Sequence, residues 1–272
     1  MSIDRREFLK IAGASTLLGI GGMSASAILK KNLLEASQVM PDPRGLTAKR
    51  WGMVVDIGKF KTEDDYKVCI EACHLVHNVP NIGTTKEEVK WIWKETYEHA
   101  FPGNEDPYLS PEIKHMPFLV LCNHCDNPPC VRVCPTKATF KRESDGIVMM
   151  DMHRCIGCRF CMAACPYGAR SFNYRDPRPF INAATENLEF PTRMRGVVEK
   201  CTFCYERLAK GLIPACVEAS QELAKKTGRE PGLIFGDLED PNSEVRKILN
   251  ERYSFRRKPE LGTYPSVYYV LG

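Results

Sequence analysis

The sequence lacks the motifs by which substrate-converting enzymes are usually recognised. Its 272 residues contain no phosphate-binding loop, no dinucleotide-binding glycine motif outside an amino-terminal apolar stretch, and no evident nucleophile–base pair. A haem-attachment C-x-x-C-H sequence is also missing, because Cys204 is followed by Tyr205. The net charge of +4 is too small to indicate a nucleic-acid partner. We therefore expect a protein that is not itself an enzyme and that binds neither a small-molecule substrate of its own nor nucleic acid.

Long apolar runs are missing after residue 29, so we expect no later membrane-spanning segment. The first 29 residues carry paired arginines, Arg5 and Arg6, then Phe-Leu-Lys and a mildly apolar run. This pattern predicts a twin-arginine export signal over 1–29 and a linker over 30–50. Ala25-Ser26-Ala27 offers a cleavage site, and retention as an uncleaved anchor is the alternative. The expected location is the periplasm or the outer face of the cytoplasmic membrane.

Cysteine, in contrast, is abundant. Thirteen is an odd number, which excludes a fully paired disulfide framework. The densest groups are Cys122-x2-Cys125-x4-Cys130-x3-Cys134-Pro (group B) and Cys155-x2-Cys158-x2-Cys161-x3-Cys165-Pro (group C). Group C has the spacing of bacterial ferredoxins, in which three thiolates bind one 4Fe–4S cluster and the fourth binds its neighbour. Structural zinc sites use two C-x-x-C pairs separated by a longer loop, so iron–sulfur ligation is favoured over zinc or disulfides.

Cross-ligation between groups B and C predicts two 4Fe–4S clusters. Cluster 1 takes Cys122, Cys125, Cys130 and Cys165, and cluster 2 takes Cys155, Cys158, Cys161 and Cys134. Two further groups look like incomplete copies of the same motif. Group A is Cys69-x3-Cys73-His74, and group D is Cys201-x2-Cys204-x11-Cys216-x3-Ser220.

The chain resembles the four-cluster ferredoxin-like electron-transfer subunits of membrane and periplasmic oxidoreductases, such as the B subunits of dimethyl sulfoxide and polysulfide reductases. The resemblance covers about residues 51–245 and rests on the four groups together with Trp51-Gly-Met-Val-Val-Asp56 and Phe235-Gly-Asp-Leu-x-Asp-Pro241. It implies an α+β fold made of tandem bacterial-ferredoxin-like dicluster modules with insertions. In that family, groups A and D exchange their last cysteines.

The exchange implies that cluster 3 takes Cys201, Cys204, Cys216 and Cys73. A fourth cluster would need the positions of Glu63, Tyr66, Cys69 and Ser220, three of which are not cysteine. We therefore predict three 4Fe–4S clusters bound by twelve cysteines, with Cys69 left as a buried thiol. The alternative is an unusual fourth cluster that uses Cys69, Ser220 and an acidic or histidine ligand.

Within the family, three complete sites, the export signal and the sequence Cys73-His-x-x-His77-Asn-Val-Pro80 are most similar to the O subunits of Dsr membrane complexes of sulfur metabolism. This resemblance implies single-electron relay between an integral membrane quinone-binding subunit and a haem-bearing or other redox subunit. The first alternative is the electron-transfer subunit of a molybdopterin polysulfide, thiosulfate or tetrathionate reductase. The second, from another class, is a zinc- or disulfide-stabilised interaction module.

The expected organisation follows from these motifs. An outer ferredoxin-like module takes residues 51–80 and 196–250, and an inner dicluster module takes 118–195. They are accompanied by an insertion at 81–117, with its own small apolar cluster, and a tail at 251–272. We expect strands at 51–56, 118–121, 233–237 and 267–270, a hairpin at 138–150, and helices at 69–77, 221–226 and 243–249.

Several other residues have two interpretations. His74 and His77 lie one helical turn apart, and hydrogen-bonding or partner-contact roles are favoured over metal or haem ligation. Trp91, Trp93 and Tyr97, at mixed helical spacing, are expected in a local core, and a docking surface is the alternative. A solvated loop is the favoured interpretation of the basic run Arg193, Arg195 and Lys200, and compensation of cluster charge is the alternative.

Overall fold

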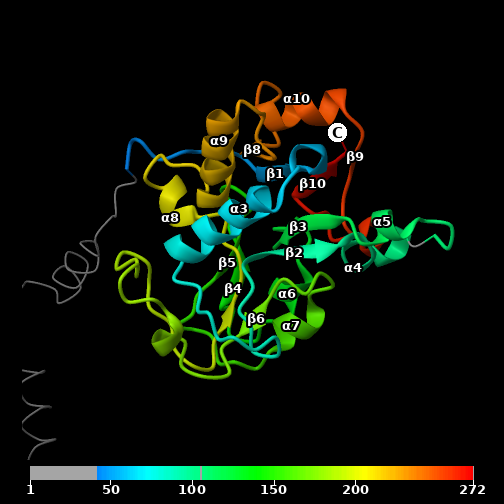
Figure 1. The fold of residues 1–272 in the computed structure, drawn as a ribbon. Helices are drawn as coiled ribbons and strands as arrows, with labels where there is room; N and C mark the ends of the chain where they lie inside the picture. Colours follow the sequence, from blue (N-terminus) through cyan, green and yellow to red (C-terminus); the bar gives the residue numbers. More distant parts are fainter. Residues whose placement is uncertain (1–41, 105, 272) are drawn as a thin grey trace, which may run out of the picture. The chain divides into compact units, whose positions relative to one another are not determined.

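A computed structural model of the chain describes residues 42–104 and 106–271 (Figure 1). The predicted export signal and most of the predicted linker lie outside the described residues. From Pro43 onwards the chain forms one compact unit. Among the described residues, none of the helices has the length and apolar character needed to cross a bilayer. The predicted module boundaries inside this unit stay a prediction.

The largest sheet joins sequence-distant strands in the order β8-β1-β10-β9. Strand β1 (Trp51–Asp56) is buried along its whole length, as expected for a continuous apolar run. It pairs antiparallel with β8 (Leu233–Asp237) and parallel with β10 (Val267–Val270), whose other edge carries β9 (Ser254–Phe255). The three longer strands were predicted from sequence and are confirmed.

Three two-stranded ribbons complete the β structure. They are β2 (Ile92–Thr96) with β3 (Pro117–Leu121), β4 (Thr139–Lys141) with β5 (Val148–Met150), and β6 (Ser171–Phe172) with β7 (Val198–Glu199), all antiparallel. The predicted hairpin at 138–150 is confirmed as β4–β5, and Gly146 in its turn has φ +75°, which favours glycine.

The two longest described helices, α3 (Glu63–Val76) and α9 (Ala215–Thr227), lie side by side (Figure 1). Helix α10 (Glu244–Glu251) confirms the predicted helix at 243–249, and its N-cap is Ser243, whose hydroxyl accepts a hydrogen bond from the Arg246 amide at 3.3 Å. The short helices are α4 (Tyr97–Ala100), α5 (Pro111–Lys114), α6 (Pro129–Arg132), α7 (Phe160–Ala164) and α8 (Tyr205–Leu208). The fold is mixed α+β, as predicted.

Two expectations need correction. Helix α9 starts at Ala215, six residues before the predicted Gln221. Pro214, directly before it, has non-helical backbone angles and marks the start of the helix. The described residues of the insertion form no separate apolar cluster, since Trp91 and Phe101 belong to the main core together with Met53. Trp93 lies in β2 rather than on a helix, although it packs against that core as expected.

Candidate metal centres

None of the thirteen cysteines, all within the described residues, forms a disulfide. Twelve of them were predicted to form three sites. For the geometry below, site 1 denotes Cys122, Cys125, Cys130 and Cys165, site 2 denotes Cys134, Cys155, Cys158 and Cys161, and site 3 denotes Cys73, Cys201, Cys204 and Cys216.

Site 1 surrounds a real cavity. All four cysteines line one small cavity of about 20 Å³, together with Pro129 and Tyr167. Cys125 interacts electrostatically with each of the other three. The segment between strand β3 and helix α6 supplies Cys122 and Cys125, helix α6 supplies Cys130, and the residue after helix α7 supplies Cys165. The predicted exchange of the last cysteine therefore brings these four side chains together.

Site 3 is deeply buried and joins two segments that lie far apart in the sequence. Cys73 comes from the last part of α3, and its side chain lies within electrostatic range of Cys201, Cys204 and Cys216. All four are nine-tenths or more buried. Cys216 lies in the first turn of α9, so the packing of α3 against α9 positions one thiol from each helix.

Site 2 lies nearer the surface. Cys134, Cys155 and Cys161 share a small apolar cluster with Val148 and Val198, while Cys158 is exposed. Gly157, between two of these cysteines, has φ +70°, and a Cβ there would approach the Gly196 carbonyl oxygen to 2.4 Å. Only glycine permits this close backbone contact.

The three sites follow one another in a row. Cys161 of site 2 interacts electrostatically with Cys130 of site 1, and Cys201 of site 3 interacts with Cys122 of site 1. Site 1 is therefore the middle member, since it neighbours both site 2 and site 3.

The surroundings of the thiols suit binding of a metal cluster. Burial raises the pKa of Cys125 and of Cys201 to about 12 and places the pKa of Cys216 well above its ordinary value. Such thiols become thiolates when positive metal replaces the proton. Backbone amides of Thr139 and Ala215 donate to the sulfurs of Cys134 and Cys204, each at 3.4 Å. Hydrogen bonds of this kind tune iron–sulfur potentials.

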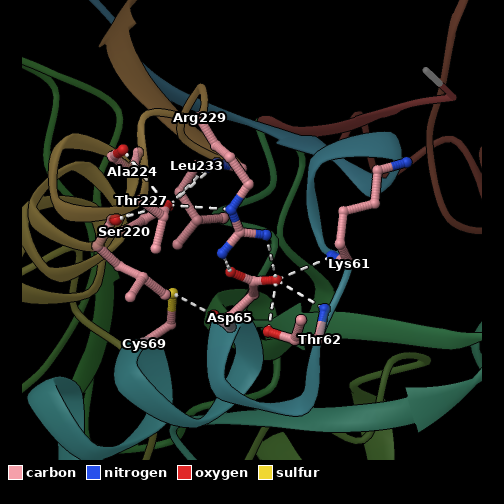
Figure 2. Close-up of polar contacts among 11 residues, drawn as sticks. Lys61, Thr62, Asp65, Cys69, Ser220, Ala224, Thr227, Arg229 and Leu233 are labelled. Atoms are coloured by element: carbon pink, nitrogen blue, oxygen red, sulfur yellow. Dashed lines mark hydrogen bonds and ion pairs between the residues drawn. The ribbon is translucent and has the colours of Figure 1, made fainter.

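Side chains of this chain fill the position that a fourth cluster would take (Figure 2). Glu63 points outward to Lys94 at 2.5 Å, and Tyr66 stacks on Phe60 with 4.7 Å between ring centroids. The Ser220 hydroxyl accepts hydrogen bonds from the amides that open β8, those of Gly232 at 3.1 Å and Leu233 at 3.3 Å. These side chains serve the fold, and their donor set does not suit a cubane.

Asp65 is the acidic side chain beside Cys69, and it is fully engaged. Its carboxylate accepts hydrogen bonds from the Thr62 amide at 2.7 Å, the Lys61 amide at 2.9 Å and Arg229 at 2.7 Å (Figure 2). Cys69 donates to the Asp65 carbonyl at 3.2 Å, and burial raises its pKa to about 12. No carboxylate is left free here to act as an unusual ligand.

His77 makes hydrogen bonds, as predicted. Its Nδ1 lies 2.7 Å from the Cys73 carbonyl oxygen and its Nε2 lies 2.9 Å from Glu206, while its ring stacks on Trp91. The ligand atoms of His77, Glu206 and Cys204 lie within 4.8 Å of one another. Because both ring nitrogens already face acceptors, this trio does not suit a separate metal ion.

The solvated-loop interpretation of the basic run is wrong for two of its three members. Arg193 is 3% exposed and Lys200 is 1% exposed, and only Arg195 reaches solvent. Arg193 pairs with Glu199 at 2.6 Å, and Lys200 donates to the carbonyls of Val148 and Cys201. The sequence did offer a signal for this burial, namely a basic run next to a cysteine pair. Buried cations are retained in proteins where negative charge lies close to them.

Sequence reasoning missed two buried side chains near the cysteines. His124 stacks on Phe203 with 3.7 Å between ring centroids, and its Nδ1 accepts from the Val148 amide at 3.1 Å. Burial, together with Lys200 and Arg170, holds the pKa of His124 well below its ordinary range, so its ring is neutral. Arg170 lies five residues after Cys165 in the sequence. Only its burial in the folded chain distinguishes it from a surface arginine.

Cysteine tetrads around buried space, in a mixed α+β fold with ferredoxin spacing, define the class of iron–sulfur electron-transfer proteins. The family model described as "4Fe-4S dicluster domain" matches residues 114–179, and a second model of that description matches 154–219. The chain belongs to the 4Fe–4S dicluster ferredoxin-type electron-transfer subunits of oxidoreductase complexes. It therefore carries multiple 4Fe–4S clusters.

Three relatives illustrate the similarity. The Hdr-like menaquinol oxidoreductase iron-sulfur subunit 1 of Archaeoglobus fulgidus is 40% identical over 287 aligned residues, covering 98% of both chains. The menaquinone reductase iron-sulfur cluster-binding subunit of Nitratidesulfovibrio vulgaris is 36% identical, covering 81% of this chain and 88% of the relative. The B subunit of tetrathionate reductase from Salmonella typhimurium is 44% identical, covering 66% of this chain and 63% of the relative.

Proposed function

We propose that this chain relays single electrons through three 4Fe–4S clusters held at sites 1, 2 and 3. It would work outside the cytoplasm, between an integral membrane quinone-binding subunit and a haem-bearing or other redox subunit of a Dsr-type complex of sulfur metabolism. The observation that carries the proposal is the row of three cysteine tetrads beside a fourth position filled by an ion pair and aromatic rings. The relatives named for menaquinol and menaquinone reactions support the quinone-linked partner.

The chemistry of a 4Fe–4S cluster is reversible uptake of one electron. The chain contributes the rest. Its cysteines fix the order of the sites, its buried walls exclude water, and its amide–sulfur hydrogen bonds set the environment in which each electron resides.

Metal analysis tests the number of clusters. We expect about 12 iron atoms and about 12 acid-labile sulfides per chain, since each cubane holds four of each. About 16 of each would contradict the three-cluster assignment. A colourless protein without iron would instead favour the zinc- or disulfide-stabilised module.

Isolation of the intact complex tests the partners. With an affinity tag on this chain, detergent extracts should yield an integral membrane protein that binds quinone, together with a haem-bearing or other redox protein. Recovery of a large molybdenum protein would reject the Dsr-type assignment and favour the molybdopterin reductase alternative; one relative is named as a tetrathionate reductase subunit.

A further inference from the structure

Arg170 lies at the boundary between sites 1 and 2. Its side chain lines the cavity of site 1 together with Cys122, Cys125 and Cys130, and the residue is only 5% exposed. It interacts electrostatically with Cys130 of site 1 and with Cys161 of site 2. One guanidinium group therefore contacts a predicted ligand of each cluster.

The remaining contacts of Arg170 are neutral. Nη1 donates to the Thr139 hydroxyl at 3.1 Å and approaches the Met150 sulfur at 3.8 Å. Nη2 is buried and has no hydrogen-bond partner. Within residues 42–104 and 106–271, no carboxylate lies within ion-pair distance of this side chain.

A buried cation without a carboxylate is costly unless another negative charge compensates it. Arginine stays charged at any physiological pH, so it cannot escape this cost by losing its proton. The groups that do face it are cysteine sulfurs, which become negative as thiolate ligands. The surroundings of Arg170 thus match two negatively charged clusters.

We propose that Arg170 is a positive charge shared by the clusters of sites 1 and 2, and that it raises the reduction potentials of both. Reduction adds one negative charge to a cluster, and a nearby cation in a low-dielectric interior stabilises the reduced form more than the oxidised form. Since the group contacts both sites, it moves the two potentials in the same direction. This inference rests on the proposed clusters.

The test is a redox titration of the full chain, monitored by electron paramagnetic resonance. Arg170→Met should lower the potentials of the clusters at sites 1 and 2 by a tenfold change in equilibrium constant or more, which is about 59 mV for a one-electron couple. The cluster at site 3 should keep its potential. Arg170→Lys preserves the charge and should largely restore the wild-type values.

Arg154→Gln is the matched control. Arg154 precedes Cys155 in the sequence, but its side chain is 65% exposed and pairs with Asp151 at 3.2 Å. Because solvent screens an exposed charge, its removal should leave all potentials nearly unchanged. A similar shift in Arg154→Gln and Arg170→Met would overturn the proposal, since burial would then not matter.

Iron and sulfide content distinguish a failure of the proposed clusters from a failure of the proposed role of Arg170. A wild-type chain without iron would remove the proposed function itself. An Arg170→Met protein with full iron content and unchanged potentials would overturn only the role of Arg170. Arg170→Met could lose the clusters altogether. Retention of iron and potentials in Arg170→Lys would then support the proposed role of the positive charge. Loss of the clusters in both variants would instead assign the arginine a purely structural role.

Discussion

Replacing Cys125 with alanine is expected to abolish electron passage through the chain. Cys125 is a predicted ligand of the middle site and interacts with all three of its partners. Loss of that cluster should lower the iron content from about 12 to about 8 atoms per chain. Sites 2 and 3 would then have no cluster between them to pass the electron on. Quinol-dependent reduction of the redox partner should therefore fall to the background rate.

Cys69→Ala is the matched control for this experiment. Cys69 is also a fully buried cysteine, but it belongs to none of the three sites and donates to the Asp65 carbonyl. Its replacement should leave iron content and electron transfer unchanged. A loss of about four iron atoms in Cys69→Ala would show that a fourth cluster exists and would contradict the three-cluster proposal.

Asp65→Ala is expected to cause the largest loss of stability among single substitutions in the filled fourth position. The carboxylate caps the start of α3 through the Thr62 amide and binds Arg229 from the segment after α9. Loss of a cap costs about 1 kcal/mol, and loss of a charged hydrogen bond costs about 1.5–3 kcal/mol. At about 2–4 °C per kcal/mol, the thermal midpoint should fall by about 5–16 °C.

Asp64→Ala provides the comparison, because Asp64 is an exposed acid in the same first turn of α3. Circular dichroism should show nearly the wild-type midpoint for Asp64→Ala, at unchanged iron content in both proteins. Equal midpoints for the two variants would show that the Asp65–Arg229 pair contributes nothing to holding α3 and α9 together.

The same carboxylate gives a pH dependence. Burial raises the pKa of Asp65, but hydrogen bonds from Arg229, Thr62 and Lys61 outweigh it and leave the pKa below its ordinary value. A depressed folded-state pKa means that the stabilisation is present above about pH 4 and is lost as the pH falls through the folded value. The difference in midpoint between wild type and Asp65→Ala should therefore shrink below about pH 4.

The local parts of this molecule could be predicted from sequence, and the long-range parts could not. Group C is identified by spacing alone, because its cysteines lie within a few residues of one another. Lys200 was misjudged because its burial depends on the Val148 carbonyl, 52 residues away. The Asp65–Arg229 pair spans 164 residues, so no local pattern could reveal what fills the fourth position. Cys73 was assigned to site 3 only through family resemblance, since it lies far from Cys201 in the sequence.

The central position of β1 has a consequence for the order of synthesis. Both of its sheet partners, β8 and β10, come from residues after 232, so a growing chain leaves the ribosome with β1 unpaired. Helix α3 follows β1 and carries Cys73, which must wait for helix α9 before it can meet Cys216. The cysteines of sites 1 and 2 are complete by Cys165 and can gather much earlier. Cofactor loading should therefore proceed in two stages, with site 3, whose last cysteine is Cys216, completed after sites 1 and 2.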